Sequence, residues 1–123
     1  MSKNEQYAID TEVRFQPLEV VDIAAVVAQC VGDWHNFTLC EVNDSVIRLG
    51  VIKGEFHWHQ HDREDEFFYV VAGRLLIDLP DATVELAPQQ GFTVPRGMQH
   101  RTRAPERTTI LMVEAATVTA TGD

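Results

Sequence analysis

Residues 54–73 read GEFHWHQHDREDEFFYVVAG, and the fold of the whole chain is predicted around this stretch. His57, His59 and His61 occupy alternate positions, and alternate residues of a β-strand share one face. Glu66 follows after four more residues and opens a short apolar run that is typical of the next strand. Imidazoles and a carboxylate that meet from two adjacent strands can hold a divalent metal ion, because each supplies a lone pair on a rigid support. The stretch therefore predicts a metal site between two neighbouring strands.

The sequence outside this stretch alternates short strands with turns. Asn43-Asp44 tolerates positive φ and suits a tight hairpin between residues 37–42 and 45–53. Proline, glycine and aspartate punctuate the later part of the chain in the same way. The later strands are expected at residues 66–71, 74–79, 82–86, 92–95 and 108–115. About eight short antiparallel strands in one small domain predict an all-β sandwich or barrel.

The N-terminal part is less regular. Residues 1–16 are polar and aperiodic, so they form either a frayed arm or an edge strand added to a neighbour. A short helix is expected from Pro17, which suits a first helical turn, with acidic Glu19 and Asp22 near its start. Several valines in this segment are poor helix formers and leave a strand as the alternative. The threonine-rich tail that follows residue 115 is expected to be ordered only by docking on the rest of the chain.

Composition excludes some classes of function. The length of 123 residues, 45% of them hydrophobic, predicts one domain with one core. A net charge of -9 without a cluster of Lys and Arg argues against a nucleic-acid or anionic-membrane partner. No signal peptide and no bilayer-length apolar run is found, which predicts a cytoplasmic protein. Cys30 and Cys40 lack metal-ligand spacing and are expected to be buried free thiols.

Two motifs around the histidines resemble those of the cupin superfamily of metal-binding jelly-roll barrels. The first reads His59-x-His61-x4-Glu66-x6-Gly73 and the second reads Pro95-x-Gly97-x2-His100. The resemblance implies a double-stranded β-helix, or jelly-roll barrel, with a short N-terminal helix. It predicts an arm and helix over residues 1–36, the barrel over 37–114 and a tail over 115–123.

The resemblance also implies a ligand set of His59, His61, Glu66 and His100 for one metal ion inside the barrel. The residues alone support the fourth ligand, because Pro95-x-Gly97 turns the backbone sharply and directs His100 onto the next strand. The chain departs from the family pattern in the spacings Gly54-x4-His59 and Gly91-x3-Pro95, and in Ala104 at the usual place of an asparagine. These departures affect loops more than ligands.

His57 shares the parity of the two ligand histidines and is the candidate catalytic residue. It is expected to be a proton shuttle, a hydrogen-bond donor to a ligand or an extra ligand. An alternative ligand set of His57, His59 and Glu64 has the same HxH-x4-E spacing, but this set places Glu64 in a polar loop. A histidine packed in the barrel and bonded to a carbonyl is an equally good interpretation of His57.

Three imidazoles and one carboxylate suit a divalent transition metal, namely Mn, Fe, Ni, Co, Cu or Zn. Four protein ligands leave places for water or a chelating small molecule, which permits Lewis-acid or dioxygen chemistry. The prediction is a metal-dependent enzyme of the isomerase, epimerase or dioxygenase type, acting on a small polar or acidic molecule. The alternative is a non-catalytic cupin that binds a small molecule or a metal as a sensor or accessory protein. A homodimer is expected, because exposed sheet edges favour pairing.

Overall fold

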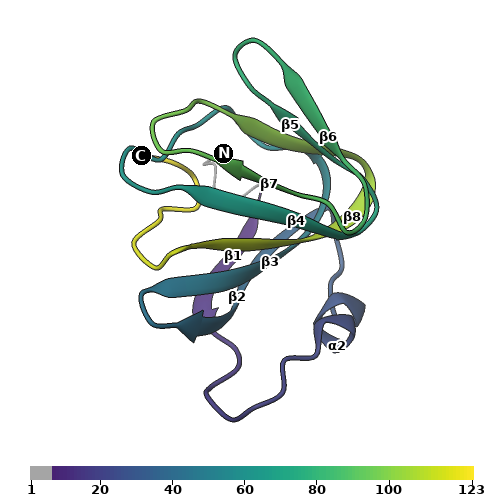
Figure 1. Cartoon of the computed structure of the whole chain (residues 1–123). Helices are drawn as coiled ribbons and strands as arrows, with labels where there is room; N and C mark the ends of the chain where they lie inside the picture. The colour runs from purple at the N-terminus through teal and green to yellow at the C-terminus, as the bar shows by residue number, and fades with distance from the viewer. Residues whose placement is uncertain (1–6) are drawn as a thin grey trace.

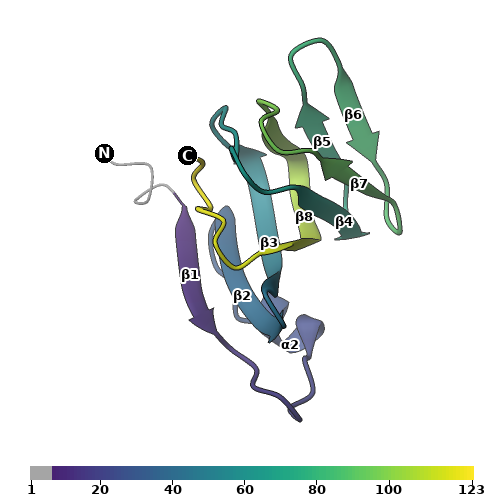
Figure 2. The same cartoon turned by 60° about the vertical axis from the view of Figure 1, so that its left-hand side comes forward.

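Short antiparallel strands dominate the structure, a computed structural model that describes residues 7–123. The elements in chain order (Figure 1) are β1 (Ala8–Val13), α2 (Ile23–Ala28), β2 (Trp34–Val42), β3 (Ser45–Glu55), β4 (Glu66–Ala72), β5 (Leu75–Asp78), β6 (Thr83–Leu86), β7 (Gly91–Val94) and β8 (Arg101–Ala115). Figure 2 shows β1, β2 and β3 on one side and β4 to β7 on the other, with β8 between them. This arrangement confirms the predicted jelly-roll barrel with a short helix.

Strand β8 joins the two sides of the barrel. The main path of the sheet runs β1-β2-β3-β8-β4-β7, and β5 pairs with both β6 and β8. The ladder between β3 and β8 shifts register between the pairs Ile52↔Thr108 and Gly54↔Ala104. Pro105, which has no N–H to donate, lies in this bulge. The bulge lets one strand pair with β5 at its start and with β4 at its end.

The structure corrects the predicted start of strand β8 and decides between the two states expected for the N-terminal arm. Strand β8 begins at Arg101, whereas the apolar pattern predicted a start at Thr108. The pattern failed because exposed charged residues and Pro105 fill the bulge. Residues 8–13 form an edge strand parallel to β2 of the same chain, which is one of the two states expected for the N-terminal arm. Residues 1–6 of that arm lie outside the described part of the chain.

The helix is shorter than predicted. It begins at Ile23 instead of Pro17, because the side chain of Asp22 accepts a hydrogen bond from the backbone N–H of Ala25 at 3.0 Å and caps the first turn. Leu18 has a φ of 75°, which a helix cannot contain. The predicted hairpin is confirmed, with Asn43 at a φ of 54° between β2 and β3.

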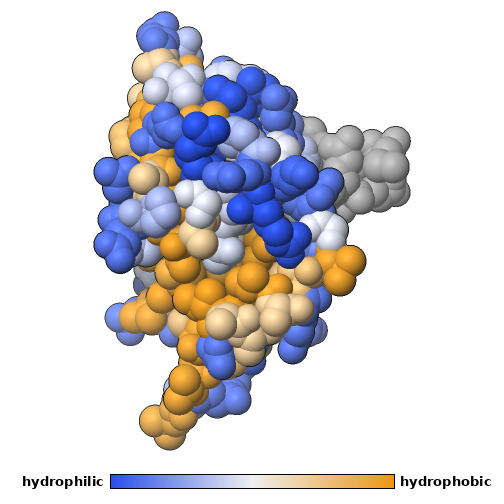
Figure 3. Space-filling model, turned by 90° about the vertical axis from the view of Figure 1, so that its right-hand side faces the viewer, coloured by the Kyte–Doolittle hydropathy of each residue, from blue (hydrophilic) through white to orange (hydrophobic). Residues whose placement is uncertain are grey.

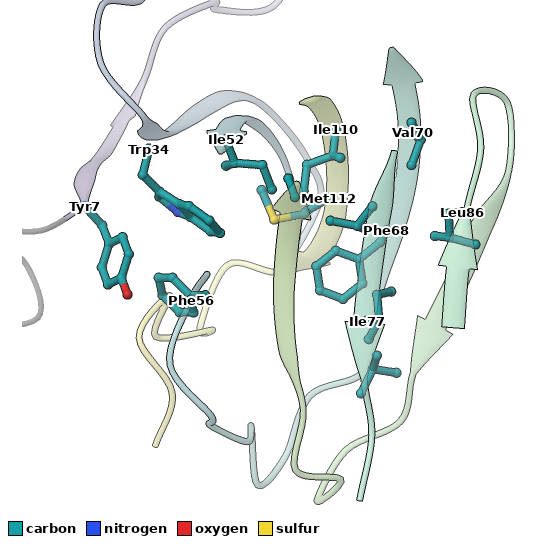
Figure 4. Packing of buried hydrophobic residues seen from close by; sticks show 13 residues of the cluster. Tyr7, Trp34, Ile52, Phe56, Phe68, Val70, Ile77, Leu86, Ile110 and Met112 are labelled. Atoms are coloured by element: carbon teal, nitrogen blue, oxygen red, sulfur yellow. The ribbon is translucent and has the colours of Figure 1, made fainter. Parts of the chain in front are cut away.

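Two apolar clusters lie on opposite faces of β3. The outer cluster consists of Val26, Leu39, Leu49 and Val51, so α2 packs against β2 and β3 (Figure 2). The inner cluster fills the barrel with larger side chains, because successive residues of a strand point to opposite faces. Its members include Trp34, Ile52, Phe56, Phe68, Ile110 and Met112 (Figure 4).

Apolar side chains also reach the surface around α2. Leu18, Val20 and Val31 flank the helix and are among the most exposed large hydrophobic residues of the described chain. Figure 3 shows apolar residues gathered on the lower part of this side of the molecule. Within residues 7–123, no helix has the length and apolar character that crossing a bilayer requires.

Candidate metal centre

The histidine segment is extended, but it is not part of a regular strand as predicted. Strand β3 ends at Glu55, and the histidine segment forms one isolated β-bridge, between His59 and His100. The backbone N–H of each of these histidines donates to the carbonyl of the other at 2.9 Å. The alternating parity survives, because the ring of His59 lies 5.3 Å from that of His57 and 5.1 Å from that of His61. The bridge thus helps to hold the imidazoles in a row.

The structure brings His59, His61, Glu66 and His100 together. Each offers a ligand atom, and these four atoms lie within 4.8 Å of one another. Glu66 is the first residue of β4, and His100 directly precedes β8. The Gly97 N–H donates to the carbonyl of His61 at 2.8 Å, so the turn predicted to direct His100 also holds the histidine segment. The residues converge as the sequence predicted, and their binding of a metal ion remains a prediction.

Backbone carbonyls fix two of the imidazoles. Nδ1 of His59 donates to the carbonyl of His57 at 3.0 Å, and Nδ1 of His100 donates to the carbonyl of Met98 at 3.0 Å. In a neutral imidazole the other nitrogen then carries a lone pair. Nε2 is therefore the ring atom of both histidines that is available to a metal ion, and hydrogen bonds within the chain set the ring orientation.

The distances between the candidate ligand atoms suit coordination of a metal ion better than they suit hydrogen bonds between these atoms. Oε1 of Glu66 lies 3.4 Å from Nε2 of His61 and 3.3 Å from Nε2 of His100. Within the described chain, all three atoms are buried without a hydrogen-bond partner. Direct N–H···O bonds are usually shorter, about 2.7–3.2 Å. Two ligand atoms at about 2.1 Å from a metal lie about 3.0 Å apart in octahedral and about 3.4 Å apart in tetrahedral geometry. The observed separations fall in or near that range.

Electrostatics divide the metal-free cluster into charged and neutral groups. Burial and the nearby His100 lower the pKa of His59 to about 4. Burial alone would raise the pKa of Glu66, but contacts with His100 and His61 hold it well below its usual range. Burial opposes a positive charge on His61, yet contact with Glu66 raises the pKa of His61 overall. Glu66 is thus an anion and His59 a neutral base near neutral pH, which are the forms that bind metals.

Two buried charged residues next to the cluster were not predicted as site residues. Glu114 lies opposite Glu66 across the β4–β8 ladder, and its Oε1 is 2.7 Å from Nε of Arg48. Arg48 and Glu114 are 4% exposed. Burial and the carboxylate of Glu66 raise the pKa of Glu114 to about 10, although Arg48 opposes this rise. The available signal was a charged residue within or next to the apolar run of each strand, but only the strand register shows that they meet.

His57 stands apart from the group of four. Its Nε2 donates to the carbonyl of Thr121 at 2.6 Å, and its ring lies 4.3 Å from that of Phe56. Its Nδ1 is buried, with no hydrogen-bond partner in the described part of the chain. This is the packed, carbonyl-bonded geometry given above as one interpretation of His57. A catalytic role for His57 remains a prediction.

The C-terminal segment, residues 116–123, docks over the histidine segment. The Asp123 N–H donates to the carbonyl of Gln60 at 2.9 Å, and the Asp62 N–H donates to Oδ2 of Asp123 at 2.7 Å. Figure 1 shows this segment, in yellow, beside the chain that leads into β4. Ala120 forms part of the wall of the inner pocket. The tail is thus ordered by docking, as expected, and covers one side of that pocket.

The inner pocket adjoins the group of four residues inside the barrel. His59 and Glu66 contribute to its wall, so a molecule in the pocket can reach this group. Water-molecule centres can occupy about 30 Å³ of it, which is room for about two waters. The apolar part of the lining comprises Trp34, Ile52, Phe56, Phe68, Ile110 and Met112, and the polar part includes Asn36, Thr102 and Glu114.

Comparison with known proteins agrees with this architecture. The chain is 46% identical over 80 residues to the uncharacterized protein YdbB of Bacillus subtilis, covering 64% of this chain and 71% of that protein. It is 47% identical over 45 residues to the polyketide synthase CurC of Streptomyces cyaneus, covering 37% of this chain and 29% of that protein. The crystal structure of a cupin-2 domain containing protein from Shewanella frigidimarina has a TM-score of 0.74 and 29% identity, over 78% of this chain and 94% of the other.

The family assignment rests on the barrel itself. The model of the Cupin domain family matches residues 47–114, from β3 to the end of the strand that carries Glu114. This stretch is more than half of the chain and contains all four residues of the ligand cluster. The protein belongs to the cupin family.

Proposed function

We propose that this protein is a metal-dependent cupin in which His59, His61, Glu66 and His100 hold one divalent transition metal ion. The supporting observation is the set of buried nitrogen and oxygen atoms that face one another at 3.3–3.4 Å without hydrogen bonds. Leaving such atoms unpaired costs about 1–3 kcal/mol each, and a bound cation removes that cost. Mn, Fe, Ni, Co, Cu and Zn all accept this combination of imidazole and carboxylate ligands.

The proposed reaction is an isomerase, epimerase or dioxygenase type of conversion of a small polar or acidic molecule. When bound, the ion supplies Lewis-acid or redox chemistry. The protein's own residues orient and enclose the ligand. The carbonyls of His57 and Met98 fix the rings of His59 and His100, and the apolar walls of the pocket exclude bulk water.

A non-catalytic cupin that binds a metal or a small molecule is the second candidate. One observation favours it: the predicted proton shuttle, His57, donates its Nε2 proton to the carbonyl of Thr121. A histidine held in this way is not free to move a proton to a ligand unless the C-terminal segment shifts. Dioxygen uptake by iron-loaded protein, and isomerisation assays with each metal, separate the two candidates.

Metal content after purification and dialysis tests the proposal. We expect about one equivalent of a transition metal per chain, and His61→Ala should weaken metal binding by at least about 100-fold because one of four ligands is lost. His35→Ala is the matched control, since His35 bonds the carbonyl of Val31 and lies outside the group of four. Full metal occupancy in His61→Ala would contradict the ligand assignment.

A further inference from the structure

We infer that the inner pocket binds a compact ring-shaped molecule that carries hydroxyl groups, such as a phenol or a catechol, in preference to a polyanion. The inference rests on the proposed function, because a hydroxyl oxygen of the ligand would complete the coordination of the metal ion. It narrows the broad class of polar or acidic molecules to one type of chemistry.

The walls of the pocket suit a flat ring. Trp34 and Phe56 stack with ring centroids 5.4 Å apart and planes 19° apart. Phe68, Ile110 and Met112 form apolar lining on the other side of the interior (Figure 4). Aromatic walls favour offset stacking or edge-to-face contact with another ring, which adds to the gain from burying its surface. A short chain of charged groups gains little from such walls.

An unpaired amide oxygen gives the pocket a polar recognition site. Oδ1 of Asn36 is buried and has no hydrogen-bond partner among residues 7–123. Asn36 lies on β2 opposite Gly50 of β3, and both residues line the pocket. A ligand hydroxyl can donate to this oxygen and relieve the cost of leaving it unpaired. A carboxylate or phosphate group offers no such donor.

The charge of the pocket also disfavours a polyanion. Within the described chain its lining contains no Lys or Arg, but it contains the carboxylate of Glu66. Arg48 is not among the lining residues, and its Nε lies 2.7 Å from Oε1 of Glu114. A second negative charge on the ligand would therefore leave water without meeting a cationic side chain in the pocket wall.

Ring binding must also move part of the wall. Space for about two waters is smaller than a benzene ring, and Ala120 is the lining residue that comes from the docked C-terminal segment. That segment is held near its end by a few hydrogen bonds, which join Asp123 to Gln60 and Asp62, and Thr121 to His57. We expect it to shift outward when the ring enters.

Tryptophan fluorescence can test this ligand class directly. The chain has two tryptophans: Trp34 lines the pocket, and Trp58 is 42% exposed outside it. Trp58→Phe therefore leaves Trp34 as the only reporter. The zinc-loaded variant is titrated with catechol and with oxalate, which can both bind a metal ion through oxygen and which differ in the ring and in the charge of the free ligand. We expect catechol to quench Trp34 and to bind at least about tenfold more tightly than oxalate.

Asn36→Leu in the same background removes the amide and keeps the size of the side chain. It should weaken catechol binding about tenfold without changing the zinc content. Asn36→Ser serves if the leucine variant does not fold. Oxalate binding as tightly as catechol, or unchanged catechol affinity in the folded Asn36 variant, would overturn the inference while the proposed metal site stands. A chain that holds no zinc would overturn the proposed function, and the inference with it.

Discussion

Neighbouring residues of strand β3 point to its two faces, and the two faces have very different surroundings. On the outer face Leu49 and Val51 are fully buried against Leu39 and Val26. On the inner face Arg48 is almost as deeply buried, but its partner is Glu114, next to the ligand cluster. Burial is similar on both sides, but among the residues that the structure describes only the inner face combines buried charged groups with buried polar atoms that lack a hydrogen-bond partner. The difference indicates that the outer face stabilises the barrel and the inner face holds groups for a ligand.

The inner face lowers the free energy of unfolding, because buried charges and unpaired polar atoms destabilise the fold unless a ligand or metal ion binds them. The outer face compensates through apolar contacts of β2, β3 and α2. Substitutions on one face should therefore change the free energy of unfolding, and substitutions on the other should change metal binding. The following predictions test that division.

The largest effect is expected on the outer face. Leu49→Ala removes a fully buried side chain and should lower the free energy of unfolding by about 3 kcal/mol, through lost burial and a residual cavity. Urea denaturation measures the change, with the exposed residue in Val31→Ala as control. Metal affinity should stay the same. A loss below about 1 kcal/mol would show that the outer cluster is not the main support of β3.

The second prediction concerns the inner face, where acid should weaken metal binding. The raised pKa of His61 means that its proton must leave before metal binds, so affinity should fall about thirtyfold between pH 6.5 and 5.0 from this group. His59, with a pKa of about 4, should already be neutral over that range.

Imidazole NMR titration of the metal-free protein resolves the two groups. The lowered pKa of His59 gives a contribution to stability that is complete above pH 6.5 and is lost as pH falls towards 4. The raised pKa of His61 gives a contribution that is complete below pH 6.5 and is lost as pH rises through the folded value. A charged His59 at pH 5.5 would contradict the assignment.

A smaller effect is expected where the two carboxyl groups meet. Glu114→Ala removes the neighbour of Glu66 and should weaken metal binding about tenfold, because the ligand carboxylate loses the group that orients it. Glu114→Gln keeps a hydrogen-bond donor and should restore most of the affinity. Glu106→Ala, at an exposed position of the same strand, is the control. Equal affinities for the alanine and glutamine variants would mean that Glu114 does not orient Glu66.

The smallest effect concerns the docked tail. In Gly122→Ala the new Cβ would lie 2.5 Å from Cβ of His59, so the segment should undock. Gly54→Ala is a close control, because Gly54 also has a positive φ but has no atom within 4 Å of the added Cβ. Hydrogen exchange of residues 118–123 should speed up only in Gly122→Ala, with a loss of global stability of about 1 kcal/mol in both variants. Equal protection of the tail in both variants would argue against the docking.

Local patterns in the sequence predicted most of the barrel and the meeting of the four candidate ligands. Alternating histidines, the spacing to Glu66 and the turn before His100 are short-range features, and each survives in the structure. The hairpin at Asn43 is of the same kind. Such features depend on backbone geometry over a few residues, and the residue types at those positions are enough to predict that geometry.

Features that depend on pairing across the chain were not predictable. The contact between Arg48 and Glu114 follows from the β3–β8 register, and the early start of β8 depends on a bulge that interrupts the apolar pattern. The bond from His57 to Thr121 requires the docked tail. Strand register and tail docking join residues far apart in sequence, so no local period indicates them.

Anomalous scattering from crystals of protein purified without added metal tests the central claim most directly. The account predicts one peak, about 2.0–2.2 Å from Nε2 of His59 and His100, a ring nitrogen of His61 and a carboxylate oxygen of Glu66. Its absorption edge would name the metal. Ordered water among these four groups and no peak, even after a soak with manganese or nickel, would contradict the account.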